Sequence, residues 1–200
     1  MAIKNIVFDF GGVLIDWNPR YFYKNVFRDQ SEMEIFLREI CNSQWNVKTD
    51  AGLSFSEATK ELQNQHPEYS SEIEMYHRNW EKMISGEIIE NTSLLEILKT
   101  KYRLFGLTNW SAEAFPVAFK KYPFFEKFEG IIVSGQEKKV KPNKDIYELL
   151  LTRYGLLASE SLFIDDNFAN IETAKELGFF TIHLNGNQTL KEQLLKSGVL

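Results

Sequence analysis

The chain has 200 residues, 44% of them apolar, which is enough to fill one substantial hydrophobic core. Acidic residues outnumber basic ones by 28 to 23, and the net charge of −5 argues against a protein that binds nucleic acid through bulk positive charge. Cys41 is the single cysteine and excludes an intrachain disulfide. The N-terminus lacks the layout of a signal peptide and no apolar run reaches membrane-spanning length, so we expect a cytoplasmic protein without a membrane partner. We expect it to be a monomer or a homodimer.

The chain starts with a predicted buried strand and continues into a predicted helical insert. Residues 3–10 contain a short continuous apolar run that ends at the turn signal Gly11-Gly12. From about 16 to 86 the apolar residues recur at helical spacing, without a convincing strand. Helices are predicted over 31–40, from the capping box at Ser54 to His66-Pro67, and over about 70–84, with a polar loop at 46–52.

The rest of the chain alternates strands and helices. The predicted strands are 102–107, 130–133, 162–164 and 179–184. The predicted helices are 91–99 with Asn91 as cap, 111–120 interrupted by Pro116, 142–154 and 171–177. Such alternation predicts an α/β fold, a doubly wound parallel sheet with helices on both faces. Its core consists of residues 1–15 and 88–200, and the insert of residues 16–87.

Polar residues gather where these strands end, and ligands bind at the carboxyl ends of an open parallel sheet. Asp9 ends the first strand, Thr108-Asn109 the second, and Asp165-Asp166 a later one, while Lys141 precedes a helix. Three carboxylates on one rim repel each other unless a cation lies among them, and an oxygen cluster of this kind suits Mg²⁺. The lysine and the hydroxyl suit phosphate oxygens, and Gly11 and Gly12 allow close approach of the backbone to a phosphate. The pattern therefore predicts metal-assisted phosphoryl transfer to a carboxylate nucleophile.

Four sequence motifs resemble those of the haloacid dehalogenase (HAD) superfamily of hydrolases and stand in the family's order. They are Val7-Phe8-Asp9-Phe10-Gly11-Gly12-Val13-Leu14, Leu107-Thr108-Asn109, Val140-Lys141-Pro142 and Phe163-Ile164-Asp165-Asp166. The resemblance implies a Rossmann-like core with a small α-helical cap, here residues 16–87. It also implies an enzyme, a Mg²⁺-dependent phosphatase acting on a small phosphorylated metabolite.

The resemblance assigns a role to each matching residue. Asp9 corresponds to the nucleophile that becomes an aspartyl-phosphate, Thr108 to the residue that hydrogen-bonds the phosphoryl group, and Lys141 to the residue that balances charge between them. The implied metal ligands are the Asp9 carboxylate, the Gly11 carbonyl, Asp166 and Asp165. Asn170 takes a place where many relatives carry another Asp.

The sequence departs from the family at Gly11, where most of its phosphatases have a second Asp as general acid and base. General acid–base catalysis contributes about 10²–10⁴-fold, so its loss matters most for substrates with poor leaving groups. The Asp-x-Gly-(Gly/Asn)-Val form is similar to a subgroup that includes sugar-1-phosphate phosphatases. A sugar phosphate is therefore the substrate hypothesis, and a water or a cap residue is left to supply the proton.

Further candidates for phosphate or substrate contact are Gly11, Gly12 and Asn109 near the motifs, and Trp45 and Asp50 in the predicted cap loop, with Asp16 as another. An ordinary surface loop is an equal interpretation for the last three. Trp80 lies on a helical stripe and is predicted to pack in the core. The three histidines show no spacing for a metal site.

Two other functions stay open. A 2-haloacid dehalogenase would use Asp9 to attack carbon without metal and also lacks the second Asp, although the acidic pair Asp165-Asp166 favours a metal. A non-catalytic protein that binds a phosphorylated metabolite would show tight binding and negligible turnover. An alternative interpretation of Lys141 is that it belongs, with the surrounding lysines, to a run of charged residues exposed to solvent.

Overall fold

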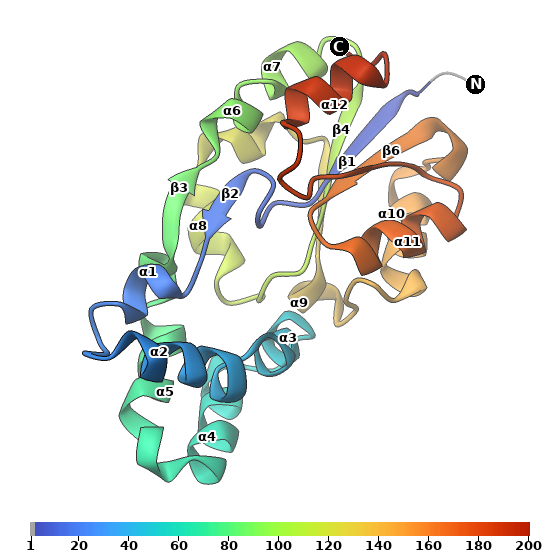
Figure 1. The fold of residues 1–200 in the computed structure, drawn as a ribbon. Coiled ribbons are helices and arrows are strands. Elements are labelled where there is room, and N and C mark those ends of the chain that lie inside the picture. The colour runs from blue at the N-terminus through green and yellow to red at the C-terminus, as the bar shows by residue number, and fades with distance from the viewer. Residues whose placement is uncertain (1–2) are drawn as a thin grey trace.

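The computed structural model describes residues 3–200 and contains a five-stranded parallel sheet (Figure 1). The strand order is β5 (Gly130–Val133), β4 (Arg103–Thr108), β1 (Asn5–Phe8), β6 (Ser161–Asp165), β7 (Phe180–His183). Each connection between consecutive strands of this sheet contains helices, as parallel strands require. The predicted Rossmann-like α/β class is confirmed.

Side chains on alternate positions of the strands enter two different cores. Ile6 and Phe8 of β1 belong to one apolar cluster and Val7 to the other, because successive side chains of a strand point to opposite faces. The first cluster packs against α7 (Leu95–Leu98), α8 (Phe115–Lys121) and α12 (Leu190–Lys196). The second packs against α10 (Lys144–Tyr154) and α11 (Phe168–Glu176), which lie together on one side of the sheet in Figure 1. Both faces of the sheet are therefore covered, which explains the continuous apolar runs in the sequence.

The cap, meaning helices α1 to α5, lies beyond the carboxyl ends of the central strands (Figure 1). Its elements are α1 (Arg20–Tyr23), α2 (Gln30–Ile35), which continues as a π-helix over Phe36–Ile40, α3 (Ser43–Asp50), α4 (Phe55–Gln65) and α5 (Ser70–Arg78). These helices have an apolar core of their own around Tyr23, Phe36 and Ile73. The predicted capping box is present: the Ser54 side chain accepts from the backbone N–H of Glu57, whose side chain reaches back to Ser54.

An antiparallel ribbon joins the cap to the sheet domain, where the sequence predicted no strand. Its strands are β2 (Ile15–Trp17) and β3 (Ile84–Glu87), which pair with a register shift beside Trp17. The residues that follow β3 are tied to the first motif, since the buried Asn91 side chain donates to the Val13 carbonyl oxygen at 2.7 Å. Asn91 therefore lies inside α6 (Ile89–Thr92) instead of capping a helix, and the predicted helix 91–99 divides into α6 and α7.

Two further local predictions differ from the structure. Residues 46–52 are mostly helical, in α3, whose first turn is capped by the Asn42 side chain accepting from Trp45 N–H at 2.9 Å. Pro116 lies in the first turn of α8, where its missing N–H costs nothing, instead of interrupting that helix. The short elements Pro67–Tyr69, Trp80–Met83, α9 (Ser134–Glu137), Pro123–Lys127 and Ala158–Glu160 complete the described chain.

No helix within residues 3–200 combines the length and the apolar character that crossing a membrane requires.

Candidate active site

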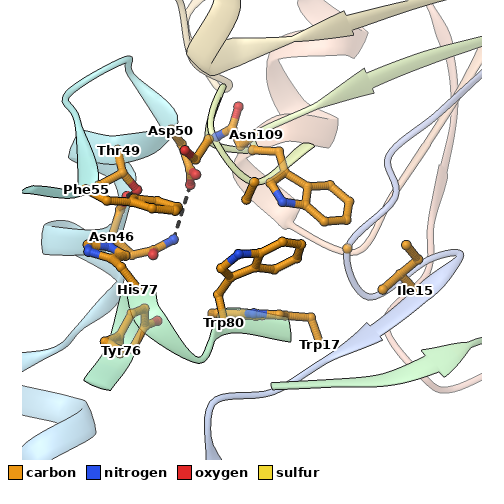
Figure 2. A pocket seen from close by; sticks show the side chains of 14 residues that line it. Ile15, Trp17, Asn46, Thr49, Asp50, Phe55, Tyr76, His77, Trp80 and Asn109 are labelled. Carbon is orange, nitrogen blue, oxygen red and sulfur yellow. Dashed lines mark hydrogen bonds between the residues drawn. The ribbon is translucent and has the colours of Figure 1, made fainter. Parts of the chain in front are cut away.

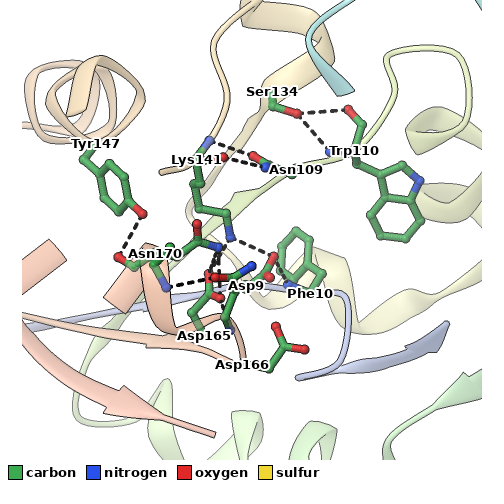
Figure 3. Close-up of polar contacts among 12 residues, drawn as sticks. Asp9, Phe10, Asn109, Trp110, Ser134, Lys141, Tyr147, Asp165, Asp166 and Asn170 are labelled. Carbon is green, nitrogen blue, oxygen red and sulfur yellow. Dashed lines mark hydrogen bonds and ion pairs between the residues drawn. The ribbon is translucent and has the colours of Figure 1, made fainter. Parts of the chain in front are cut away.

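Three strand ends bring motif residues together at one edge of the sheet (Figure 3). Asp9 follows β1 directly, Thr108 ends β4, and Asp165 ends β6 with Asp166 next to it. The β1 register aligns Phe8 with Gly106 and Ile164, so Asp9 lies between the ends of β4 and β6. The alignment follows from parallel pairing alone and places residues that are up to 157 positions apart around one point.

Lys141 is the cation at the centre of this cluster. Its ammonium lies 2.6 Å from Asp165 Oδ2 and 3.0 Å from Asp9 Oδ1, and its side chain is fully buried. Burial alone would lower the pKa of Lys141, but the two carboxylates reverse this and raise it. Lys139 and Lys144 instead form exposed ion pairs with Asp145 and Glu176. The solvated charge run thus describes the neighbouring lysines and not Lys141.

Asn109 fixes the backbone of Lys141. Its side-chain amide donates to the Lys141 carbonyl oxygen at 3.0 Å and its oxygen accepts from the Lys141 N–H at 2.9 Å. The sequence predicted that Asn109 contacts phosphate or substrate, whereas the structure commits its amide to this pair of hydrogen bonds. Asn109 also lines the pocket described below, so its remaining surface faces that space.

Asp9 has one engaged and one free carboxylate oxygen. Its Oδ1 accepts the Phe10 N–H at 2.7 Å and the Lys141 ammonium, and no hydrogen bond to Oδ2 occurs within residues 3–200. Burial raises the pKa of Asp9 to about 7, with Lys141 opposing this and the charges of Asp165 and Asp166 adding to it. A cation beside Asp9 would lower this pKa and keep the carboxylate ionised at neutral pH.

The carboxylates of the acidic pair Asp165-Asp166 differ in how far hydrogen bonds and ion pairs occupy their oxygens. Asp165 is completely buried; its Oδ1 accepts from Asn167 N–H at 2.8 Å, its Oδ2 accepts from Lys141, and the Asn170 amide lies 3.1 Å from both oxygens. The Asp166 carboxylate forms no ion pair in the part of the chain that the structure describes, and partial burial together with Asp165 raises its pKa. Asp166 is therefore the member of the pair with ligand capacity to spare.

The cluster fits a hard divalent cation. Asp9, Asp165 and Asp166 each offer a carboxylate oxygen, and these atoms lie within 4.8 Å of one another. Lys141 contacts two of these carboxylates, which leaves the group with more negative than positive charge. A cation bound by carboxylate oxygens would offset the excess, and oxygen ligands are those that Mg²⁺ prefers.

The two glycines after Asp9 differ in their surroundings. Gly12 has a φ of +69°, and a Cβ there would lie 2.2 Å from Asp166 Oδ2, so this position requires glycine. A Cβ on Gly11 would meet nothing within 4 Å, and its backbone is not left-handed. The side-chain space that an acid could fill at Gly11 is therefore open.

A pocket lies between the cap and the sheet domain beside these residues (Figure 2). Most of its lining is aromatic or apolar: Ile15, Trp17, Phe55, Tyr76, His77, Trp80, Trp110 and Ala114. Its polar lining residues are Asn46, Thr49, Asp50, Asn109 and Ser111, and Gly11 completes the lining. The Trp80 and Trp110 rings meet edge to face with centroids 6.4 Å apart, one from the base of the cap and one from the sheet domain.

A sequence model of the haloacid dehalogenase-like hydrolase family matches residues 6–184. The chain belongs to this family. It is a hydrolase whose matched region includes all four motifs and the whole cap.

Relatives and solved structures of the HAD family match nearly the full length of the chain. A sesquiterpene phosphatase of Aspergillus oryzae is 28% identical over 185 residues, covering 92% of this chain and 90% of that protein. A phosphorylated carbohydrates phosphatase of Thermotoga maritima is 24% identical over 201 residues, covering 95% and 91%. A HAD family enzyme of Bacteroides thetaiotaomicron, solved with magnesium and inorganic phosphate, has the same fold with a TM-score of 0.72 at 22% identity, covering 96% of this chain and 99% of its own.

Of the cap residues predicted as candidates for substrate contact, Asp50 lines the pocket, whereas Trp45 and Asp16 do not. Trp45 does not line the pocket: it is 5% exposed in the cap core, and its indole N–H donates to the Ala58 carbonyl oxygen at 3.0 Å. The Trp45 side chain therefore packs inside the cap, on the face of α3 that turns toward α4, and outside the pocket lining. Asp16 accepts hydrogen bonds from the Tyr21 hydroxyl and also lies outside the pocket lining. Asp50 does line the pocket, from the last turn of α3.

Trp80 and His77 are among the aromatic lining positions that the sequence did not identify as part of a pocket. Trp80 was predicted to pack in the core, and it does contact the core cluster, but it also lines the pocket. His77 lies between the Phe55 and Trp45 rings, at 4.2 and 4.7 Å between centroids, and burial lowers its pKa to about 4. Helical spacing puts both residues on the inner face of their segment but cannot tell a packed interior from the wall of a cavity.

Proposed function

We propose that the protein is a Mg²⁺-dependent phosphatase that hydrolyses a small phosphorylated metabolite through an aspartyl-phosphate on Asp9. The observation that carries this proposal is the buried ion pair of Lys141 with Asp9, placed within a carboxylate cluster whose neighbours Gly11 and Asn109 line a pocket. The phosphatases among its relatives support the same reaction class.

In this proposal the free Oδ2 of Asp9 attacks phosphorus while Oδ1 stays bound to the Phe10 N–H and Lys141. Lys141 offsets the charge of the nucleophile and the phosphoryl oxygens, and Asn109 holds its backbone in place. Thr108, buried at the end of β4, donates to a phosphoryl oxygen. The Gly12 backbone approaches the phosphate, because no side chain stands there.

The proposed magnesium ligands are the carboxylates of Asp9 and Asp166 and the Gly11 carbonyl oxygen. Asp165 completes the acidic group and holds Lys141 in place, since each of its oxygens already accepts two hydrogen bonds. Bound Mg²⁺ supplies Lewis-acid polarisation of the phosphoryl oxygens and offsets the surplus negative charge.

The pocket would hold the organic part of the substrate. Aromatic rings such as Trp80 and Trp110 pack against apolar faces, which both sugars and isoprenoid groups possess. Phosphorylated carbohydrates and a sesquiterpene phosphate are therefore the first two substrate classes to test. We also propose that residues 1–15 and 88–200 form the catalytic domain and residues 16–87 a cap domain that closes over it.

The proposal is tested by phosphate release from p-nitrophenyl phosphate and from both substrate classes, with Mg²⁺ and with chelator. We expect release that requires Mg²⁺ and disappears in Asp9→Asn, whereas Asp145→Asn, which removes only an exposed carboxylate, keeps full activity. Chloride release from a 2-haloacid in chelator would instead support a dehalogenase. Tight binding of a sugar phosphate without turnover would support a binding protein.

A further inference from the structure

We infer that Asp50 of the cap is the general acid and base of this enzyme, in place of the carboxylate that Gly11 cannot supply. The inference rests on the proposed phosphatase function and adds the group that protonates the leaving group. It assigns to the cap a chemical step as well as the closing of the pocket.

On the sheet-domain side of the pocket, Gly11 stands where most phosphatases of the family carry an acidic side chain, and it leaves that space open. A Cβ on Gly11 would meet nothing within 4 Å. Across the same pocket, Asp50 is the single carboxyl group among the lining residues. Figure 2 shows its side chain entering from the cap. The leaving group of a phosphate ester bound at Asp9 would extend into this space, between Gly11 and the cap.

A hydrogen bond and the packing of its helix hold Asp50 in place, as a general acid requires. It ends α3, and its Oδ2 accepts a hydrogen bond from the Asn46 amide one turn earlier at 3.3 Å. The chain then turns at Gly52, whose φ is +99°. A Cβ on Gly52 would lie 3.2 Å from the Gly135 carbonyl oxygen and 3.0 Å from the Lys138 side chain, both in the sheet domain. The end of α3 therefore rests directly on the sheet domain.

Its surroundings also favour a carboxyl group that exchanges protons near neutral pH. Burial and the charge of Asp9 raise the pKa of Asp50 to about 7, with Lys141 opposing them. The carboxyl end of a helix disfavours negative charge, which acts in the same direction. A catalytic acid is most effective when its pKa lies near the working pH.

The other two ionisable lining residues are poorer candidates. Burial lowers the pKa of His77 to about 4, so its imidazole carries no proton to donate as a cation at pH 7. Its Nδ1 already contacts Thr59 Oγ1 at 3.0 Å. Burial also raises the pKa of the Tyr76 hydroxyl far above neutrality, so Tyr76 is a weak acid here.

The proton balance closes over the two half-reactions. As Asp9 Oδ2 forms its bond to phosphorus, the bond from phosphorus to the ester oxygen breaks, and protonated Asp50 gives its proton to that oxygen. The alcohol leaves. Ionised Asp50 then takes a proton from the water that attacks phosphorus, the aspartyl-phosphate bond breaks, and the Asp9 carboxylate and inorganic phosphate are released. Asp50 ends protonated, ready for the next turnover.

The test uses two substrates of nearly equal size that differ in leaving group. Phenolate is the stronger base and depends on protonation in order to leave, whereas p-nitrophenolate is the weaker base and depends on it far less. In Asp50→Asn, which keeps the shape and a hydrogen bond to Asn46, we expect kcat/KM for phenyl phosphate to fall by about 10²-fold or more, and that for p-nitrophenyl phosphate by less than about 10-fold. Glu61→Gln, which removes an exposed cap carboxylate paired with Lys48, is the matched control and leaves both unchanged.

The pH profile gives a second readout. Hydrolysis of phenyl phosphate by the unmodified enzyme should decline as pH rises above about 7, where Asp50 loses its proton, and this limb should vanish in Asp50→Asn. The charged or titratable groups that face Asp50 are Asp9 and Lys141 in the sheet domain, Tyr76 and His77 on α5, and Lys138 beside Gly52. Asp9 affects the acidic limb of the pH–rate profile, because the nucleophile must be ionised and becomes protonated as the pH falls.

The outcomes separate this inference from the proposed function. Equal losses on the two substrates with an unaltered pH profile, or no loss on either, would overturn the role of Asp50 while leaving the phosphatase intact. Recovery of phenyl phosphate hydrolysis when Gly11→Asp is added to Asp50→Asn supports it, since that carboxylate enters the open space of the same pocket. An unmodified enzyme that releases phosphate from neither substrate overturns the phosphatase and this inference together.

Discussion

Replacement of Lys141 by Met should weaken both the fold and the chemistry, because one ammonium serves two buried carboxylates. Lys141 lies 2.6 Å from Asp165 and 3.0 Å from Asp9, and neither its side chain nor that of Asp165 is exposed. Breaking a buried pair from one side leaves an uncompensated charge, which costs about 3–5 kcal/mol. We expect the free energy of unfolding in urea, followed by circular dichroism, to fall by that amount.

A neighbouring lysine provides the matched control. Lys139→Met removes the same side chain from an exposed ion pair with Asp145, and exposed pairs contribute less than about 1 kcal/mol. The double variant Lys141→Met, Asp165→Asn should recover part of the loss, because it removes one stranded charge. Equal losses for Lys141→Met and Lys139→Met would refute the reasoning, since the two sites would then be electrostatically alike.

The activity of Lys141→Met should respond to pH in a defined direction. Lys141 lowers the pKa of Asp9, which burial raises to about 7, so its loss raises that pKa further. Asp9 is then protonated over more of the neutral range, and the nucleophile ionises only at higher pH. The acidic limb of the rate profile for p-nitrophenyl phosphate should therefore move to higher pH, and a limb that stays in place would contradict the role of Lys141.

Three further changes test the metal, the first motif and the pocket. Asp166→Asn should raise the Mg²⁺ concentration for half-maximal activity by at least the roughly 10–100-fold that loss of an outer ligand partner costs, and an unchanged requirement would exclude Asp166 as a ligand. Gly12→Ala should lower the unfolding free energy by about 1 kcal/mol or more, because the φ of Gly12 is +69° and the added methyl group would meet Asp166. Gly11→Ala should cost less, because a methyl group there meets open space. A thermal melt that ranks the two variants the other way disproves this. Trp80→Ala should raise KM for phenyl phosphate roughly 2- to 10-fold through lost ring contact and leave inhibition by inorganic phosphate unchanged, and a parallel rise in both would place Trp80 at the phosphate instead.

The motif residues at this edge of the sheet could be predicted because each one stands at the end of a recognisable strand. A continuous apolar run marks a strand buried on both faces, and parallel strands end at a common edge, so Asp9, Thr108 and Asp165 had to lie near one another. The choice of Lys141 among its neighbouring lysines needed the family motif, since charge alone does not distinguish them. The structure then showed it buried and the others exposed.

The predictions that differ from the structure concern a strand whose pairing partner is distant in the sequence and helical residues that either fill a core or line the pocket. The strand Ile15–Trp17 is only three residues long and is defined by pairing with Ile84–Glu87, which no local pattern reveals. Helix α3 has a polar sequence, and its first turn depends on one capping contact from Asn42. Trp45 and Trp80 both suit an apolar interior, yet one fills the cap core and the other lines the pocket.

The sequence by itself determined the α/β class, the order of the motif residues and the absence of an acid at Gly11, because these depend on short-range periodicity and on residue identity. The tertiary structure alone decided which carboxylates retain free oxygens, which aromatic rings line the pocket and that Asp50 faces the open space above Gly11. Those features arise from packing within the sheet domain and of the cap against it, where distances between residues far apart in the chain are set by the whole fold and not by any segment of it.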